Sequence, residues 1–583
     1  MQYTGARILI ESLVEQDVDT VFGYPGSAVL YIYDELYKHR DRIRHILVSH
    51  EQHAAHAADG YARSTGRPGV CIATSGPGAT NLITGIATAY MDSIPLVAIT
   101  GNVPTSLLGK DSFQEVDIAG VSMPVVKHNW IVKDVRDLAE VIREAFIVAL
   151  SGRPGPVLID IPSDVTVLCA EWTAAKAKKS NAAVSRLSGN DDLSARAIRL
   201  AEREERLTFD EGDIDKVAVM IREAKRPLIY AGGGIISANA GDELTALAEK
   251  LNAPVALSLM GIGAIPGEHR LCTGLTGMHG TVASNKAVQK TDLLLAVGAR
   301  FSDRVTSHTG KFAKNAKVIH FDIDPAEINK NIKTDLWVIG NAKKTLACLL
   351  EKFPSELKTG WNGEIEKWKT HIPKTGSPDR AVSKDALYPR YVIEEAAAKL
   401  GKETIAVTDV GQHQIWAAQF FPAPRPRSFL SSGGLGTMGF GLGAAAGAKI
   451  ANPGRPVVLF TGDGCFRMNC TELSTLGAYN IPVLIIVFQN GVLGMVRQWQ
   501  TFFFGKRLSE TILSPYPDFI KLGEAYGIAG FRAEDRKSFS EALSSALAEL
   551  SGGKAAIIEA HISPEENVLP MVPSGKPIDE QIL

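Results

Sequence analysis

GDGCFRMNCTELSTLGAYNIPVLIIVFQNGVLGMVRQWQ, residues 462–500, contains the pattern that decides the fold of this chain. An apolar run at 456–461 predicts a buried strand that stops at the first glycine, and a run at 482–488 predicts a second strand that stops just before Asn490. Ligands of α/β sheets bind at the carboxyl ends of strands. If the two strands are neighbours, the carboxylate of Asp463 converges with the Asn490 amide oxygen and with backbone carbonyls. Such oxygen ligands suit a Mg²⁺ ion that holds a diphosphate.

The alternative is a plain βαβ turn, in which Asp463 caps a helix and Asn490 lies in a loop. The spacing of 27 residues to an Asn after a second buried strand favours the metal site over this alternative. The pattern is similar to the motif of thiamine diphosphate (ThDP) enzymes. That similarity implies that the backbone carbonyl of Val492 supplies the third protein ligand.

Composition excludes several classes of protein. A hydrophobic fraction of 45% and a charged fraction of 22% indicate an ordinary globular chain, and 583 residues predict about three or four domains. The net charge of −2 offers no electrostatic attraction for nucleic acid or an anionic membrane. No apolar run reaches the roughly 18 residues of a transmembrane span. Six scattered cysteines without a CxxC pair favour reduced thiols and a cytoplasmic location, and the early helical pattern predicts no leader peptide.

Strand and helix patterns alternate along the chain and predict an α/β fold of three doubly wound parallel-sheet domains. We expect the first domain at 1–170, the second at 214–350 and the third at 386–583. The polar segment 171–213 and the proline-punctuated segment 351–385 are interpreted as linkers.

The first and third domains contain matching units. GVCIATSGPG leads through a helix to IPLVAITG, as PVVLFTGDG leads through a helix to IPVLIIVFQN. The span from Gly76 to Ile94 is 18 residues and that from Gly462 to Ile481 is 19 residues. The match predicts that the two domains are structurally related, although any two βαβ units can be similar by chance.

The segment SHEQH, residues 49–53, precedes an alanine-rich helix. Glu51 is either a carboxylate that stabilises the helix N-terminus or, given the ThDP motif, the acid that protonates the cofactor's pyrimidine ring. We favour the second role. His53 and His56 could suggest a metal pair, but we interpret them as surface histidines of the helix. Gly76 begins a glycine-rich turn whose backbone amides could meet an anion.

The middle domain has two predicted strands that end at polar, glycine-rich turns. The glycines 232–234 follow a strand but lack a full GxGxxG fingerprint. Asp322 and Asp324 end a strand, where an acidic side chain can hold ribose hydroxyls, and Arg300 and Arg304 could pair with an anion. A nucleotide site in the middle domain is therefore one interpretation of this spacing.

Nearly the whole chain resembles the large catalytic subunit of the acetohydroxyacid synthase (biosynthetic acetolactate synthase) family. The similarity runs through FGYPGSA, EQHAAHAADGYAR, TSGPGATN, PTSLLGKDSFQEVD, SGRPGPVLIDIP, GMHG, ARFSDRV, VGQHQIWAAQF, SGGLGTMGFG, GMVRQWQ and NVLPMVPSG. RFSDRV and GMVRQWQ distinguish this family from other ThDP enzymes.

The resemblance implies a carboligase that uses ThDP, Mg²⁺ and FAD, with the flavin as a structural requirement in the middle domain. It would decarboxylate pyruvate and join the two-carbon unit to pyruvate or 2-ketobutyrate. The products, 2-acetolactate and 2-aceto-2-hydroxybutyrate, lead to the branched-chain amino acids valine, leucine and isoleucine. The resemblance also implies a homodimer or homotetramer with active sites at the subunit interface, and a separate small regulatory subunit.

Site residues follow from the same resemblance. The catalytic and substrate-facing set is Glu51, Phe113, Gln114, Lys127, Arg304 and Trp499. The ThDP set is Gly76, Gln412, His413, Met438, Gly462, Gly464 and Met495, with Asp463, Asn490 and Val492 for the metal. The flavin set is Arg153, Met278, His279, Arg300, Asp322 and Asp324. For Arg304 and Trp499 the alternatives remain pairing of the arginine with Asp303 or Asp324 and a core position for the tryptophan.

The chain also departs from the family pattern. The family usually has Gly at Ser27, Pro at Tyr31, Gly at His53, Gln at Asn102, Thr at Lys110 and Pro at Gly443. Lineage drift is one explanation. A pocket with a changed acceptor or altered sensitivity to channel-blocking inhibitors is the other.

Two rival functions stay open at this point. A pyruvate-oxidase-type enzyme would use FAD as the electron acceptor, and GMVRQWQ argues against it. A non-catalytic nucleotide-binding protein would not need Glu51, Asp463 and Asn490. Glyoxylate carboligase is disfavoured because that relative lacks the acid at the Glu51 position.

Overall fold

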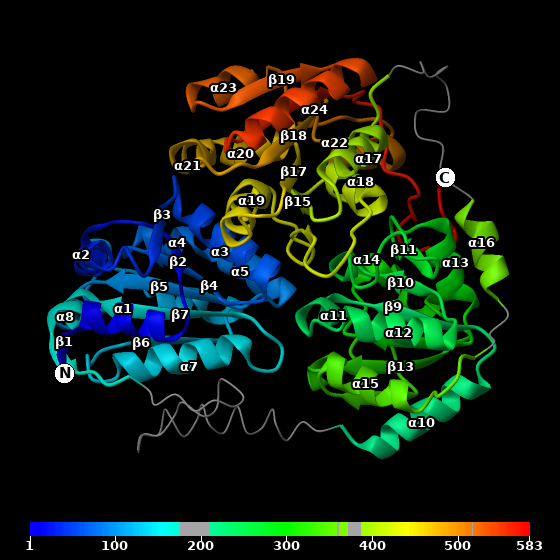
Figure 1. The fold of residues 1–583 in the computed structure, drawn as a ribbon, viewed down its shortest axis with the longest axis horizontal. Coiled ribbons are helices and arrows are strands. Elements are labelled where there is room, and N and C mark those ends of the chain that lie inside the picture. The colour runs from blue at the N-terminus through cyan, green and yellow to red at the C-terminus, as the bar shows by residue number, and fades with distance from the viewer. Residues whose placement is uncertain (175–208, 358–360, 371–385, 516) are drawn as a thin grey trace. The chain divides into compact units, whose positions relative to one another are not determined.

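The computed structural model describes residues 1–174, 209–357, 361–370, 386–515 and 517–583. It contains three six-stranded parallel sheets, which confirms the predicted α/β class (Figure 1). The chain forms two compact units, each described by itself below. One comprises 1–206, 432–454 and 469–483, and the other comprises 207–431, 455–468 and 484–583.

The N-terminal sheet lies between two layers of helices (Figure 1). Its strand order is β3 (Arg44–Leu47), β2 (Thr20–Tyr24), β4 (Gly69–Ala73), β5 (Leu96–Asn102), β7 (Pro156–Pro162) and β6 (His128–Ile131). One face packs on α1 (Gly5–Glu15), α2 (Leu30–Lys38) and α7 (Leu138–Leu150). The other face packs on α3 (Glu51–Thr65) and α5 (Ile83–Asp92). Because both faces are buried, the strands are almost continuously apolar.

Short elements complete this domain. They are α4 (Pro77–Asn81), α6 (Ile118–Ser122), α8 (Ser163–Val167) and an antiparallel pair of β1 (Gln2–Thr4) with β8 (Cys169–Glu171). Of the expected linker 171–213, residues 175–208 lie outside the described residues.

The middle sheet has the order β11 (Cys272–Leu275), β10 (Val255–Leu257), β9 (Pro227–Ala231), β12 (Leu293–Val297), β13 (Lys317–Asp322) and β14 (Leu336–Ile339). One face packs on α10 (Glu211–Glu223), α12 (Gly241–Leu251) and α15 (Ala342–Glu351). The other face packs on α13 (Val282–Lys290), α14 (Asp303–Thr306) and α16 (Asn362–Lys369). A short helix, α11 (Gly233–Ser237), follows β9. Helix α16 lies within the segment 351–385 that the sequence suggests is a linker; residues 358–360 and 371–385 lie outside the described residues.

The C-terminal sheet has the order β16 (Phe429–Leu430), β15 (Ile405–Thr408), β17 (Val457–Gly462), β18 (Leu484–Gln489), β20 (Ala556–His561) and β19 (Ala529–Ala533). Helices α17 (Pro389–Leu400), α18 (Gln412–Phe420) and α24 (Arg536–Ser551) share a core with it. Helices α22 (Gly494–Phe503) and α23 (Phe519–Ala525) belong to the same unit, as does α20 (Asp463–Asn469) up to residue 468. Helices α19 (Phe440–Ala451) and α21 (Leu473–Tyr479) belong to the unit of the N-terminal sheet.

Strand order confirms the predicted relation between the first and third domains. Counted from the first strand of each sheet, both follow the order 2-1-3-4-6-5, and the matching units form their third and fourth strands. The middle sheet follows 3-2-1-4-5-6, the order of dinucleotide-binding folds. No helix within the described residues is long and apolar enough to cross a membrane.

Small residues let helices α3 and α19 approach each other closely. A Cβ added at Gly447 of α19 would lie 1.9 Å from the carbonyl oxygen of Ala57, and one at Gly60 of α3 would lie 2.1 Å from that of Ala444. Both neighbours are backbone atoms, which cannot move aside as a flexible side chain can. The contact therefore requires glycine at these positions.

We expect Gly447→Ala to destabilise the protein. Alanine is about 1 kcal/mol better than glycine in a helix, but overpacking against a backbone carbonyl costs about 1–3 kcal/mol, so the clash outweighs the gain. The midpoint of thermal unfolding should fall in this variant and not in Gly454→Ala, because no atom lies within 4 Å of a Cβ at that position. Equal midpoints in the two variants would contradict the close packing of α3 and α19.

Candidate active site

The two strands of the opening motif are parallel neighbours, paired from Val458 with Leu484 to Gly462 with Phe488. This register places Asp463 and Asn490 together just beyond the carboxyl edge of the sheet. One Asp463 oxygen accepts from the Gly464 N–H at 2.8 Å. The other accepts from the Gly491 N–H at 2.7 Å and the Asn490 N–H at 3.3 Å. The Asn490 Oδ1 atom accepts from the Val492 N–H at 3.2 Å.

Asp463 is buried, and burial raises its pKa to about 6 although three backbone N–H groups oppose the shift. A cation would reverse this effect because it favours the charged form. No group of three or more His, Cys, Asp or Glu side chains is placed to hold a metal in the described part of the chain. A hard cation beside Asp463 would therefore depend on amide and carbonyl oxygens, which Mg²⁺ accepts.

Buried polar atoms near this turn fit an absent polar ligand. Gln412 Oε1 and His413 Nε2 have no hydrogen-bond partner among the described residues, and burial lowers the pKa of His413 to about 3. A Cβ at Gly494 would lie 2.0 Å from Gln412 Oε1, and one at Gly462 would lie 2.9 Å from His413 Nδ1. The glycines thus leave space around two uncharged polar side chains, as a diphosphate with its own cation requires.

Glu51 occupies the first position of α3, and His50 is the N-cap. The Glu51 Oε2 atom accepts a hydrogen bond from Asn81 Nδ2 at 2.9 Å. A Cβ at Gly78 would lie 3.2 Å from its Oε1 atom, so the glycine turn after β4 leaves room for this carboxylate. The side chain is half-buried and remains open to a ligand.

Two of the other predicted residues of the N-terminal domain lie at the glycine turn after β4, and Lys127 and Arg153 contact other groups. Gly76 and Gln114 have φ angles of 59° and 58°, and a Cβ at Gly76 would lie 2.8 Å from Gln114 O. Phe113, beside Gln114, is 86% exposed. Lys127 donates to the Val148 and Ser151 carbonyls at the end of α7. Arg153 donates from Nε to Ser93 Oγ at 2.7 Å.

In the middle sheet, the order in which successive strands are added reverses between β9 and β12. Open α/β sheets bind their ligands at such a switch point. A Cβ at Gly234 would lie 2.5 Å from Gly298 Cα, so backbone from both strand ends meets there. Arg300 follows this turn, and the adjacent strand β13 ends at Asp322. Asp322 accepts from the Asp324 N–H at 3.0 Å. The arrangement fits a nucleotide that needs a close backbone approach and an acidic partner.

Comparison with known proteins follows the same division into three parts. The N-terminal TPP binding domain of thiamine pyrophosphate enzymes matches residues 3–121, the central domain matches 214–349 and the C-terminal TPP binding domain matches 409–560. A probable acetolactate synthase large subunit of Methanococcus aeolicus is 44% identical, covering 98% of this chain and 94% of its own. The acetolactate synthase large subunit of Buchnera aphidicola subsp. Schizaphis graminum is 44% identical, and the match covers 100% of this chain and 98% of the relative. The chain belongs to the acetolactate synthase large-subunit family.

The segments GMHG at 277–280 and ARFSDRV at 299–305 pack together. The Met278 N–H donates to Arg304 O at 2.8 Å, and Arg304 Nη1 lies 3.9 Å from Met278 Sδ. Arg304 Nε is also 3.8 Å from Asp303, which is one of the alternatives considered for this arginine. His279 is buried, and burial lowers its pKa to about 4.

Residues 566–571, here called the C-terminal tail, contact residues of the two predicted cofactor sites. Gln412 Nε2 donates to Gln498 Oε1 at 3.0 Å and to Glu566 O at 2.9 Å. Gln498 pairs with the Val568 backbone through its amide oxygen at 2.8 Å and its amide nitrogen at 3.0 Å. Two residues further on, the Pro570 carbonyl lies 3.1 Å from His279 Nδ1.

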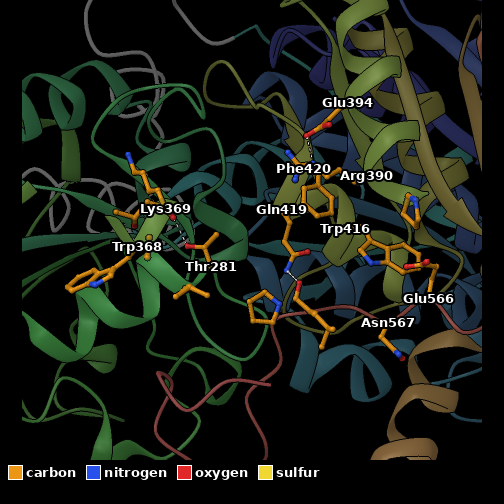
Figure 2. A pocket seen from close by; sticks show the side chains of 16 residues that line it. Thr281, Trp368, Lys369, Arg390, Glu394, Trp416, Gln419, Phe420, Glu566 and Asn567 are labelled. Atoms are coloured by element: carbon orange, nitrogen blue, oxygen red, sulfur yellow. Dashed lines mark hydrogen bonds and ion pairs between the residues drawn. The ribbon is translucent and has the colours of Figure 1, made fainter. Parts of the chain in front are cut away.

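A cavity of about 260 Å³ lies beside this tail (Figure 2). Trp416 and Phe420 of α18 and the buried Glu566 line it, and burial raises the pKa of Glu566 to about 7. None of the predicted site residues lines it. Its lining residues contact the predicted sites: Gln419 donates to His279 O at 3.0 Å, and Glu566 O accepts from Gln412 Nε2.

Trp499 is half-buried on α22, with its ring 5.1 Å from that of Phe503. Met495 on the same helix packs against the C-terminal core, and Met438 is half-buried before α19. The interpretation of His53 and His56 as surface histidines is wrong: their exposed fractions are 2% and 0%. Both histidines are buried because α3 is covered on both sides, by its own sheet and by α19. The alanine-rich sequence of the helix does not show this second covering.

Sequence reasoning also missed three polar residues. Asn81 orients Glu51, Gln498 holds the tail, and Glu472 forms a buried pair with His53. Asn81 and Gln498 stand inside the quoted motifs TSGPGATN and GMVRQWQ, which was the available signal.

We expect Gln498→Leu to release the tail. The change would leave the Val568 N–H and C=O and Gln412 Nε2 short of a partner, at about 1–3 kcal/mol for each buried unsatisfied group. Limited proteolysis should then cleave near 566–571 much faster than in the unmodified protein. Gln500→Leu is the matched control, because Gln500 lies on the same helix but bonds to Ser509 and Thr511. Equal cleavage rates in the two variants would show that Gln498 does not hold the tail.

Proposed function

We propose that this chain is an acetolactate synthase catalytic subunit that requires ThDP, Mg²⁺ and FAD. One observation carries the proposal. Asp463 and Asn490 lie close together, each just after the carboxyl end of one of two neighbouring parallel strands. The chain that contains them is similar over nearly its whole length to acetolactate synthase large subunits. The substrates would be pyruvate and a second 2-keto acid, in branched-chain amino-acid synthesis.

We assign the pyrimidine-binding, flavin-binding and diphosphate-binding domains to 1–170, 214–350 and 386–583. When bound, ThDP would supply the nucleophilic carbon and accept the electron pair that decarboxylation releases. Asp463, Asn490 and the Val492 carbonyl would hold Mg²⁺. The diphosphate and the rest of the cofactor would contact Gly76, Gln412, His413, Met438, Gly462, Gly464 and Met495.

The first domain would provide acid and substrate contacts. Glu51 would share a proton with the remote ring nitrogen of the pyrimidine, oriented by Asn81. Phe113, Gln114 and Lys127 would face the substrate. We infer that Glu51 of one subunit serves the Asp463 site of a second copy, so that a homodimer is the smallest active form. A small regulatory subunit would join it, since the relatives are named large subunits.

The middle domain would hold FAD at the β9–β12 switch point. Asp322 and Asp324 offer carboxylates for ribose hydroxyls, and Arg300 offers a cation for a phosphate. Met278, His279 and Arg153 complete the proposed flavin set. The close approach of the Gly234 and Gly298 backbones at the switch point and the buried, uncharged His279 support this assignment.

The test of function is a product assay with pyruvate, with and without an electron acceptor. Acetolactate without flavin turnover supports carboligation. Acetate with flavin bleaching would instead identify the pyruvate-oxidase type, and absence of any product with bound ThDP and FAD would identify a non-catalytic relative.

Glu51→Gln should keep hydrogen-bonding shape but remove the acid. We expect exchange of the C2 hydrogen of bound ThDP to slow by about 10²–10⁴-fold, the usual scale of general acid–base help. The control Glu11→Gln changes a carboxyl group of α1, which pairs with Arg42. The role of Glu51 is wrong if exchange is as fast in its variant as in the control.

Asp463→Ala should abolish Mg²⁺-dependent ThDP binding. The change also removes the acceptor of three backbone N–H groups, so circular dichroism of the variant is compared with that of the unmodified protein. Asp518→Ala is the control: Asp518 caps α23 in the same domain, where its carboxylate accepts from the Ile520 and Lys521 N–H groups. Calorimetric titration with ThDP and Mg²⁺ measures the effect. Unchanged ThDP affinity in Asp463→Ala would count against the metal site.

Acceptor choice is the third prediction for this site. We propose that the Arg304 fork pairs with the acceptor carboxylate and that Trp499 forms an apolar wall. One methylene distinguishes 2-ketobutyrate from pyruvate and is worth roughly 10–200-fold in an apolar pocket. Trp499→Leu should therefore erase most preference for 2-ketobutyrate in a competition assay, whereas Phe503→Leu should not. An unchanged product ratio in Trp499→Leu would exclude the tryptophan as the selector.

A further inference from the structure

We propose that Glu472, acting with His53, is a positioning residue that fixes the backbone on both sides of Glu51. The inference rests on the proposed function, in which Glu51 is the catalytic acid. Glu472 lies in the short segment Cys470–Glu472 between α20 and α21.

One carboxylate oxygen of Glu472 contacts residues on both sides of Glu51 in the chain. Glu472 Oε2 accepts from the Ser49 N–H at 3.1 Å and lies 2.5 Å from His53 Nδ1. Ser49 stands two residues before Glu51 and His53 stands two residues after it. Movement of Glu51 relative to Glu472 therefore requires one of these two hydrogen bonds to lengthen.

Hydrogen bonds between neutral groups also join these two segments, including one between Ser49 Oγ and Ser474 Oγ. Ser49 Oγ donates to Thr471 O at 3.0 Å, and the Leu47 N–H donates to Tyr479 Oη at 3.0 Å. Thr475 Oγ1 donates to Leu47 O at 3.3 Å. These contacts involve neutral groups and mostly precede Glu51, so the Glu472 pair is the charged contact that reaches beyond it.

Burial makes the pair strong. The exposed fractions of His53 and Glu472 are 2% and 1%. Burial by itself would lower the pKa of His53, but the Glu472 carboxylate outweighs this and holds the pKa above the ordinary 6.5. Removing one partner of such a pair leaves a buried charge without compensation, which is costly.

The groups that face His53 come from three elements. The Glu472 carboxylate and the Asn469 side chain face it from the 469–472 segment. On α3, the His50 ring lies 5.9 Å away, and burial first and then His53 and Arg63 lower the pKa of His56 to about 3.

Helix α19 supplies the third element through Gly443. A Cβ at Gly443 would lie 3.2 Å from His53 O and 3.0 Å from His56 Cβ.

The pH dependence has a definite sign. A raised pKa means that the protonated pair contributes fully below about pH 6.5 and that its contribution is lost as the pH rises through the higher pKa of folded His53. The advantage of the unmodified protein over His53→Gln should therefore be greatest in acid and should shrink toward alkaline pH.

The first experiment needs no cofactor. Amide hydrogen exchange at residues 47–53 should quicken by about tenfold or more in Glu472→Gln, since hydrogen bonds to charged groups are stronger than those between neutral groups. Glu15→Gln is the matched control: it removes a carboxylate that pairs with Arg143 at 2.8 Å in the same unit, far along the chain from Glu51. NMR titration should also show that the pKa of His53 falls in Glu472→Gln.

The second experiment adds ThDP and Mg²⁺. C2 hydrogen exchange should slow by up to about 10²-fold in Glu472→Gln and in His53→Gln below pH 6.5, the scale expected for a small displacement of a catalytic group, with ThDP affinity little changed. Amide exchange or C2 exchange equal to that of Glu15→Gln overturns the inference. Failure of the unmodified protein to bind ThDP would instead overturn the proposed function, while the cofactor-free comparison would still decide whether Glu472 fixes residues 47–53.

Discussion

The parallel pairing of β17 with β18 is the constraint on which the predicted site depends. Their register brings Asp463 and the turn from Asn490 to Val492 to one edge of the sheet. Three backbone N–H groups then converge on a buried carboxylate. A shift of one residue along either strand would turn each side chain to the opposite face and would separate the acid from the amide turn.

Glycine performs a second general task in this chain, because it permits close backbone approach where function or packing needs it. Gly494 leaves room beside Gln412, and Gly447 lets α19 meet α3. In each case a Cβ would meet an atom at 2.0 Å or less. The same chemistry therefore serves a ligand site in one place and helix packing in another.

Polar groups buried in these domains fall into two kinds. Asp160 is fully buried, yet Thr100 and Asn102 each donate to it at 2.6 Å, so its hydrogen bonds are made within the fold. Gln412 Oε1 and His413 Nε2 have no such partner among the described residues. Buried polar atoms are rarely left unpaired, so these two atoms beside the Asp463 turn fit a polar ligand there.

The sequence by itself determined the three α/β domains, the kinship of the first and third, and the strand-end positions of Asp463 and Asn490. These depend on local apolar patterns and on spacing, which a sequence shows directly. Only the tertiary structure decided that His53 and His56 are buried, that Glu472 reaches Ser49 and His53, and that Gln498 holds Val568. The partners in the last two contacts are separated by 70 or more residues, and no local pattern encodes which distant polar groups a fold brings together.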